Sequence, residues 1–242
     1  MSIASLNNKV VVVLGGTSGI GLAVAQAAAL GGAKVRVASR DPSRVAAAVK
    51  ALPPGAEGVA LDLSDGAAVA AFFAGHGALD HLVYTAGESL SLAPLAETDL
   101  ATARRAFELR YWGAFAAAQA AAPRLRPGGS IVFTSGSAGA RPRPTWAVAA
   151  SICTAVEGLT RALALELAPI RVNAVAPGVV RTPLWRGMTD EAREALYADQ
   201  ATRLPVGHVG EADEIAEAYL YLMRQTYVTG QLLSVDGGGL LV

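Results

Sequence analysis

Residues 10–21 read VVVVLGGTSGIG, an apolar run that leads directly into a turn with glycines at positions 15, 16, 19 and 21. The run has the length of one buried strand, and the Ala-rich residues 20–30 that follow predict a helix. Glycines let the chain turn tightly, bring backbone N–H groups close to a pyrophosphate and pack the helix on the strand. Because the helix N-terminus then faces the phosphates, this order predicts a dinucleotide-binding turn.

Short apolar runs alternate with Ala- and Leu-rich stretches along the rest of the chain. Most of the short runs are apolar throughout, which is typical of parallel strands covered by helices on both faces. We therefore expect an α/β fold with one doubly wound parallel sheet and a single domain over residues 1–242. The expected strands are 10–14, 34–38, 58–61, 81–84, 130–134, 171–176 and 232–235, and the expected helices are 20–30, 42–51, 66–73, 99–122, 148–167 and 211–223.

The segment 184–210 interrupts this alternation and is interpreted as irregular. It lies beyond the strand expected at 171–176. Ligands of open parallel sheets bind beyond the carboxyl ends of the strands, and long insertions there often carry function. We expect a lid-like insertion around 184–210.

Composition narrows the classes of function. Hydrophobic residues make up 52% of the 242 residues and charged residues 17%, which favours an ordered core. The formal net charge of +0 argues against a partner nucleic acid or anionic membrane. Cys153 is the single cysteine, which fits a reducing compartment. With no signal-peptide pattern and no apolar stretch of about 20 residues, we expect a cytoplasmic protein.

Several motifs together resemble those of the classical short-chain dehydrogenase/reductase family over nearly the whole chain. The glycine turn has the family's G-x-x-x-G-x-G spacing, with Leu14 where a threonine usually stands. Asp62-Leu63 resembles the pair that contacts the adenine ring. Ala86-Gly87 is similar to the end of the N-N-A-G motif, with Tyr84-Thr85 in place of the two asparagines.

The late part of the chain carries the same resemblance. Residues 171–178, RVNAVAPG, and 235–238, VDGG, are similar to late motifs of the family, and Thr182-Pro183 follows at the spacing of the threonine that touches the nicotinamide amide. The resemblance implies a Rossmann-type fold and a dinucleotide cofactor. The predicted cofactor-binding residues are Gly15, Thr17, Ser18, Gly19, Ile20, Gly21, Ser39, Arg40, Asp62, Leu63, Thr85, Ala86, Gly87, Pro177, Gly178, Val180 and Thr182.

The end of the second expected strand decides which dinucleotide is predicted. An NAD site usually places a carboxylate there, which would repel a 2′-phosphate. Here Ser39 occupies that position and Arg40 follows it. A guanidinium pairs with a phosphate through two hydrogen bonds, so we expect NADP(H). The alternative is that Arg40 is an ordinary solvated arginine and Asp41 takes the NAD role one residue later.

The resemblance implies a catalytic Asn, Ser, Tyr and Lys, and all four are replaced at the positions that the family's spacing assigns. These positions hold Arg110, Gly136, Ala149 and Cys153. No tyrosine occurs between Tyr111 and Tyr197 and no lysine occurs after Lys50, so no shift of register restores those two.

The serine is different, because Ser135 and Ser137 flank Gly136 and a shift of one residue would restore a hydroxyl. The loop before residue 171 is also about two residues shorter than the family's.

Loss of these groups slows hydride transfer without forbidding it. A positioned general acid is worth about 10²–10⁴ in rate, whereas holding two reactants in attack geometry is worth about 7–11 kcal/mol. Arg110 can stabilise an oxyanion but cannot give up a proton, and compensation for the lost lysine is the alternative. Cys153 is a nucleophile only with a depressed pKa, and otherwise a small buried filler.

Other candidate residues have plainer interpretations. For Tyr111 and Trp112 we expect packing or a subunit contact, and for His208 a solvated loop position rather than a substrate contact. Arg141 and Arg143 either meet an anionic substrate at the pocket mouth or stiffen an exposed loop. His76 and His81 lie near the opposite strand ends, and no metal site is predicted.

Three functions remain open at this point. The first is an atypical oxidoreductase that transfers hydride between NADPH and a carbonyl-type small molecule. The second is a catalytically silent NADP(H)-binding subunit or redox sensor, and the third is a non-redox enzyme that uses the same pocket. The Ala-rich helices at 99–122 and 148–167 match the family's subunit-packing helices, which predicts a homodimer or homotetramer.

Overall fold

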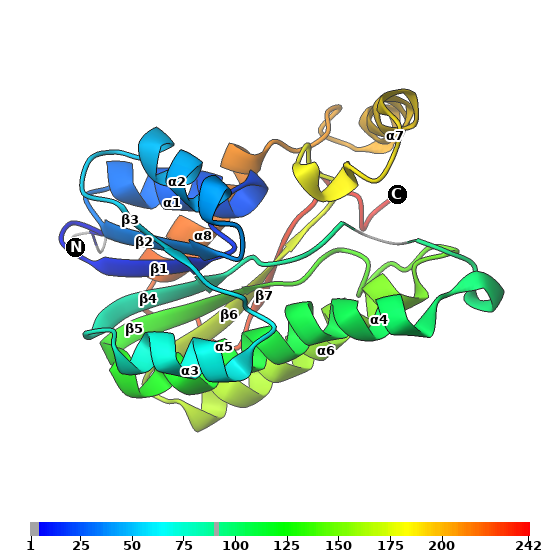
Figure 1. Ribbon diagram of the computed structural model, residues 1–242. Helices are drawn as coiled ribbons and strands as arrows, with labels where there is room; N and C mark the ends of the chain where they lie inside the picture. The colour runs from blue at the N-terminus through cyan, green and yellow to red at the C-terminus, as the bar shows by residue number, and fades with distance from the viewer. Residues whose placement is uncertain (1–4, 90–91) are drawn as a thin grey trace.

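Within the residues that the computed structural model describes, seven parallel strands form one sheet in the order β3-β2-β1-β4-β5-β6-β7, with helices on both faces (Figure 1). The structure describes residues 5–89 and 92–242. The expectation about a signal peptide also concerns Met1–Ala4, which lie outside the described residues. The strands are β1 (Val10–Leu14), β2 (Lys34–Ser39), β3 (Glu57–Ala60), β4 (Leu79–Tyr84), β5 (Leu125–Thr134), β6 (Arg171–Pro177) and β7 (Leu232–Val235). The doubly wound α/β prediction is confirmed.

Two apolar layers lie on opposite faces of the sheet and hold the helices in place. One layer packs α1 (Gly19–Leu30), α2 (Pro42–Ala51) and α8 (Ala212–Arg224) against the strands. The other packs α3 (Gly66–Ala74), α5 (Gly113–Ala121) and α6 (Ala147–Glu166) on the opposite face, as Figure 1 shows. Strands β4 and β6 are buried along their whole length, as parallel strands between two helical layers must be.

The segment 184–210 is not irregular, which corrects the sequence interpretation. It contains a short 3₁₀ turn, Pro183–Trp185, and helix α7 (Asp190–Arg203), which begins at an N-cap hydrogen bond from Ala192 N to Thr189 Oγ1. Trp185, Tyr197 and Val209 form a small apolar cluster that fastens α7 to the segment beneath it. The polar surface of α7 hides its helical periodicity in the sequence, because only two of its residues, Tyr197 and Gln200, are buried.

The helix expected at 99–122 is also modified. It divides into α4 (Leu100–Phe107), a π-helical turn over Glu108–Trp112, and α5. The Gly113 amide donates to the Glu108 carbonyl, five residues back, which inserts one extra residue into the turn. π-Turns of this kind occur frequently at functional sites.

Helix α6 corrects a further expectation. By length and composition alone it is apolar enough to cross a membrane, so such a stretch is present after all. One face of α6, with Val156, Leu159 and Leu163, packs into the core against the sheet, which is the usual position of an apolar helix inside a globular fold.

Candidate functional site

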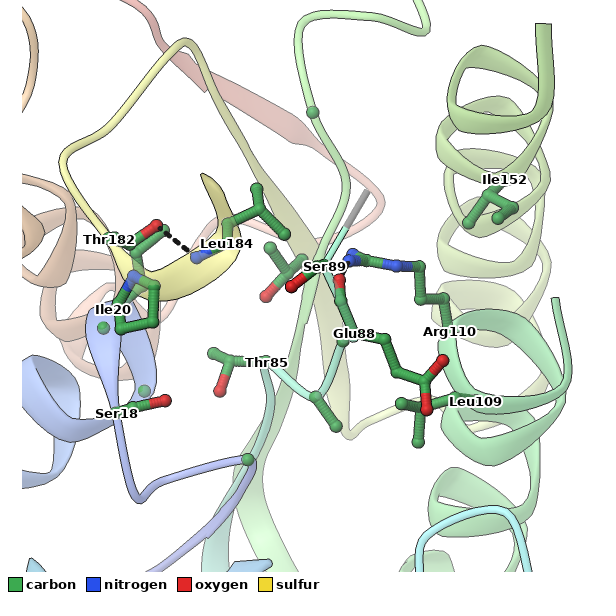
Figure 2. Close-up of a pocket in the computed structure, with 18 of the residues that line it drawn as sticks. Ser18, Ile20, Thr85, Glu88, Ser89, Leu109, Arg110, Ile152, Thr182 and Leu184 are labelled. Atoms are coloured by element: carbon green, nitrogen blue, oxygen red, sulfur yellow. Dashed lines mark hydrogen bonds between the residues drawn. The ribbon is translucent and has the colours of Figure 1, made fainter. Parts of the chain in front are cut away.

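A cavity of about 600 Å³ opens at the carboxyl ends of the strands, between the β1–α1 turn and the α4–α5 helix. Every residue predicted to contact the cofactor lines this cavity, as do all four positions of the implied catalytic set. Figure 2 shows the two sides of the cavity, with Ser18, Ile20 and Thr182 facing Leu109, Arg110 and Ile152. The topology brings together segments as far apart in the chain as residues 15 and 182 because all these strands end at one edge.

The β1–α1 turn requires its glycines. Gly15 and Gly19 have φ values of 89° and 50°, in the left-handed region that side chains rarely adopt. A Cβ on Gly15 would lie 2.5 Å from the Ala86 amide nitrogen, and one on Gly21 would overlap Gly15 O and Thr85 Oγ1. The turn therefore packs directly on the segment after β4 and leaves its backbone facing the cavity.

The N-terminus of α1 lies in this cavity without a side-chain cap. Its N-cap residue, Ser18, makes no capping hydrogen bond, whereas α2, α3 and α4 are each capped by an aspartate. The first amides of a helix need acceptors and carry a partial positive charge. The uncapped helix end and the glycine turn therefore fit a bound pyrophosphate.

The end of β2 places Ser39, Arg40, Asp41 and Arg44 on the cavity wall. The carboxylate of Asp41 caps α2, because its Oδ1 accepts from the Ser43 amide at 2.8 Å and the Ser43 hydroxyl at 2.7 Å. These hydrogen bonds lower the pKa of Asp41. Arg44 lies 3.7 Å from the same carboxylate, so Asp41 is already engaged by its own helix.

The Asp62-Leu63 pair lies at the same rim of the cavity. Asp62 accepts hydrogen bonds from the Ser64 hydroxyl at 2.6 Å and the Ser64 amide at 3.0 Å. These bonds, and more weakly the charge of Arg40, lower the pKa of the Asp62 carboxyl. Asp62 and Arg40 are therefore close enough to influence each other across the cavity rim.

Residues 171–182 have two roles: the first of them hold the scaffold together, and the later ones line the cavity. Arg171 donates to the carbonyls of Leu222 and Met223 at 2.6 and 2.9 Å, and Asn173 joins β6 to the segment before β7, so both hold the scaffold. The chain then passes along the cavity wall at Pro177, Gly178, Val180 and Thr182. The hydroxyl of Thr182 accepts from the Leu184 amide, the dashed line in Figure 2.

The four positions of the implied catalytic set lie together on the other side. A Cβ on Gly136 would lie 3.2 Å from Cys153 Sγ, so these two positions are neighbours. Ala149 precedes Cys153 by one helical turn on α6. Among the described residues that line the cavity, none is a tyrosine, lysine or histidine.

Arg110 projects from the π-turn into this part of the cavity, and in Figure 2 its side chain reaches from the helix towards Ser89. Its Nη2 donates to the Glu88 carbonyl. A Cβ on Gly87 would lie 2.5 Å from the guanidinium carbon, so the absence of a side chain there makes room for Arg110. Burial lowers the pKa of Arg110, while Cys153, Tyr84 and Glu88 raise it.

Tyr84, which stands where the family's motif has an asparagine, supports the π-turn from below. It is 2% exposed, and its hydroxyl donates to the Leu109 carbonyl. The same hydroxyl fills the space that a side chain at position 113 would need, so Gly113 is a requirement of this contact. Burial raises the pKa of Tyr84, which keeps the phenol protonated.

Cys153 and Ser135 are poor candidates for a proton donor or a nucleophile. Burial raises the pKa of the Cys153 thiol, more than the Ser135 hydrogen bond and the charge of Arg110 lower it. The neutral thiol favours the filler interpretation over the nucleophile. The Ser135 hydroxyl donates to Glu157 Oε1 at 3.1 Å and to the Cys153 carbonyl at 3.3 Å, so it is engaged by α6.

The remaining candidates lie away from the cavity lining that the structure describes. His208 is exposed and pairs with Glu214 at 3.1 Å, and His81 is buried against the Ser130 hydroxyl at 2.8 Å. Arg141 donates to the Gly239 carbonyl, and Arg143 lies over the Trp146 ring at 5.6 Å. These arginines line a minor cavity beside the main one. His76, another of the sequence candidates, is buried. Tyr111 packs against the core, and Trp112 is 51% exposed.

Sequence reasoning missed several residues of the cavity wall. Arg44 follows Arg40 by one helical turn, a spacing that could have pointed to it. Nothing local marks Trp146, Trp185 or Arg186, which the chain brings to the cavity from distant segments. The missed lining residues also include Ser64, Glu88, Ser89, Arg105, Glu108 and Ile152.

Comparisons with known proteins agree with this arrangement. A family model described as Enoyl-(Acyl carrier protein) reductase matches residues 15–239. The short-chain dehydrogenase/reductase malC of Malbranchea aurantiaca is 32% identical over 253 residues, which cover 98% of this chain and 96% of malC. The crystal structure of a small-chain dehydrogenase in complex with NADPH is 37% identical, with a TM-score of 0.84 over 98% of this chain and 100% of that chain.

A further similar structure is an NADPH-bound short-chain oxidoreductase from Pseudomonas aeruginosa PAO1, described as containing an atypical catalytic center. It is 30% identical, with a TM-score of 0.88 over 95% of this chain and 96% of that chain. The sequence and the fold of this chain are thus similar to those of these relatives over nearly its whole length. The chain belongs to the short-chain dehydrogenase/reductase family.

Proposed function

We propose that this protein is an NADP(H)-dependent oxidoreductase that acts on a carbonyl-type small molecule without the Asn-Ser-Tyr-Lys set of its family. The observation that carries the proposal is a single cavity with two differing ends. One end has the glycine turn, the uncapped α1 terminus and Arg40, and the other has Arg110 with no described tyrosine or lysine. NADPH, when bound, supplies the hydride.

The choice of NADP(H) over NAD(H) rests on the end of β2. Ser39 leaves space where a carboxylate would select NAD, and Arg40 and Arg44 offer positive charge to a 2′-phosphate. The competing role for Asp41 is disfavoured because its carboxylate caps α2. Two similar structures were solved with NADPH.

The missing acid constrains the chemistry of the substrate end. Tyr84 and Cys153 keep their protons because burial raises the pKa of each, and Arg110 cannot give one up. Arg110 instead supplies positive charge at the substrate end, and the proton comes from solvent. An activated carbonyl, imine or alkene suits this arrangement better than an ordinary ketone. A similar oxidoreductase is itself described as having an atypical catalytic center.

The same feature favours one alternative, a catalytically silent NADP(H)-binding subunit or sensor. Binding machinery without a described general acid is what such a protein needs. The two functions differ in turnover by the isolated protein, so they can be separated directly.

The first experiment is a titration of the purified protein with NADPH and NADH, followed by nucleotide fluorescence and thermal shift. We expect tight binding that is selective for NADPH. NADPH oxidation is then measured with a panel of activated carbonyls, imines and alkenes. Because the described lining of the cavity holds no histidine, tyrosine or lysine, the rate should be nearly constant from about pH 6 to 9.

Each outcome has a definite meaning. Failure to bind either nucleotide would contradict the cofactor assignment, and binding without turnover across the panel would favour the silent subunit. A rate that falls tenfold per pH unit above a single pKa would reveal a proton donor that this proposal lacks.

We also propose a homodimer or homotetramer. Trp112, the last residue of the π-turn, is 51% exposed, and Phe115 on α5 is 38% exposed beside alanines. Leu165 on α6 is 84% exposed. Such large apolar side chains on smooth helices suit a two-fold contact. Light scattering coupled to size-exclusion chromatography tests this, and a monomer at micromolar concentration would contradict it.

A further inference from the structure

The guanidinium of Arg110 lies at the substrate end of the cavity, on the side of Cys153. Its hydrogen bond goes to a neutral acceptor, the Glu88 carbonyl. No carboxylate lies within ion-pair distance of it among residues 5–89 and 92–242. In Figure 2 the Glu88 side chain turns away from the guanidinium towards Leu109.

The position of this cation is fixed by three contacts. The π-turn aims Arg110 inwards, and the Tyr84 hydroxyl holds the turn at the Leu109 carbonyl. The guanidinium occupies the space that a side chain on Gly87 would need. A group held by its neighbours in this way needs no reorganisation when a ligand arrives.

The surroundings leave Arg110 without an ion-pair partner among the described residues. Burial lowers the pKa of Arg110 more than the nearby Cys153, Tyr84 and Glu88 raise it. The Cys153 thiol beside it is neutral, because burial raises its pKa. Arg105 and Arg186 line the same cavity from exposed positions, and Glu88 and Glu108 are the acids on this side.

We propose that Arg110 makes the substrate end a carboxylate-binding site, so that the molecule processed there is an organic acid. A guanidinium binds a carboxylate through two parallel hydrogen bonds, and this pairing offsets the cost of a half-buried charge that has no ion-pair partner. A neutral carbonyl would leave that charge in place. The inference names the substrate class of the proposed oxidoreductase and rests on that function for the reaction, but the anion site can be tested without it.

Cys153 is a built-in reporter, because it is the single cysteine and lies beside Arg110 in the cavity. The full-length protein is alkylated with iodoacetate, which carries a carboxylate, and with its neutral analogue iodoacetamide. The ratio of the two rate constants, followed by intact mass, measures the preference for an anion and cancels any change in the thiolate fraction. We expect a ratio about tenfold above that of an exposed cysteine peptide.

Variants show whether the preference for iodoacetate comes from Arg110 or from the overall charge of the protein. Arg110→Gln should bring the ratio down to that of the peptide, and Arg110→Lys, which keeps the charge, should retain most of it. Arg104→Gln is the matched control, because Arg104 is exposed on the same helix and does not line the cavity. Equal ratios in the wild type and Arg110→Gln would overturn the inference.

A second measurement does not depend on alkylation. At constant ionic strength, sodium benzoate should raise the melting temperature of the wild type more than benzamide does, and Arg110→Gln should abolish the difference. No preference for benzoate in the wild type would count against the carboxylate site. NADPH titration of the same variants keeps the two proposals apart, because loss of NADPH binding with the iodoacetate preference intact would overturn only the oxidoreductase.

Discussion

The two ends of the cavity differ in how far they follow the family that the chain belongs to. The cofactor end, built by the β1–α1 turn and the ends of β2 and β6, keeps the glycines and small residues that a dinucleotide requires. The substrate end, built by the π-turn, the segment after β5 and α6, has Arg110, Gly136, Ala149 and Cys153 at the positions of the implied catalytic groups. Binding and chemistry lie on separate segments, so one can change while the other stays intact.

The largest effect is expected when the implied catalytic groups are restored at the substrate end. The variant Arg110→Asn, Gly136→Ser, Ala149→Tyr and Cys153→Lys should raise NADPH-dependent reduction of simple ketones by about 10²–10⁴, the worth of a positioned general acid. The same variant with Ala149→Phe is the control, because it has the ring without the hydroxyl. No gain over this control would mean that the pocket has also been reshaped.

The cofactor end is tested most severely at Gly21. A Cβ there would overlap Gly15 O and Thr85 Oγ1, so Gly21→Val forces the turn away from the segment after β4. NADPH affinity should fall at least about tenfold, or 1.4 kcal/mol. Gly158→Ala on α6 meets no atom within 4 Å and should leave binding unchanged, as isothermal titration calorimetry would show. Normal binding by Gly21→Val would contradict the role of the turn.

A smaller effect is expected at the rim of the cofactor end. Arg40→Gln should weaken NADPH binding about tenfold, because a charge-assisted hydrogen bond to phosphate is worth about 1.5–3 kcal/mol, and should leave NADH binding unchanged. The fluorescence titration compares the two nucleotides directly. An equal loss for both would move Arg40 from the 2′-phosphate to a general electrostatic role.

The smallest predicted effect sharpens the substrate end. Tyr84→Phe removes the hydrogen bond to the Leu109 carbonyl and should cost about 1 kcal/mol of unfolding free energy, or about 2–4 °C in melting temperature. It should also lower the iodoacetate preference at Cys153, because the π-turn that aims Arg110 loses its support. A fall in stability with an unchanged preference would limit Tyr84 to packing.

The fold was predictable because periodicity and glycine spacing are local. The apolar runs 10–14 and 171–176 form strands as expected, and nearly all of their residues are buried. The helix α7 was missed because its surface is mostly polar, and the π-turn was missed because one inserted residue leaves no mark in an Ala-rich stretch. The cavity wall at Trp146 and Arg186 could not be predicted, since it depends on how distant loops meet.

The sequence by itself determined the parallel α/β sheet, the glycine turn and the absence of tyrosine and lysine from the expected catalytic segments. These follow from residue type and spacing along the chain, where steric and hydrophobic preferences act locally. Only the tertiary structure decided that Asp41 is engaged as a helix cap, that Arg110 lines the cavity without an ion-pair partner among the described residues, and that Tyr84 and Gly87 fix its position. Hydrogen bonding and burial depend on neighbours that are remote in sequence, so their outcome is set when the strand ends converge.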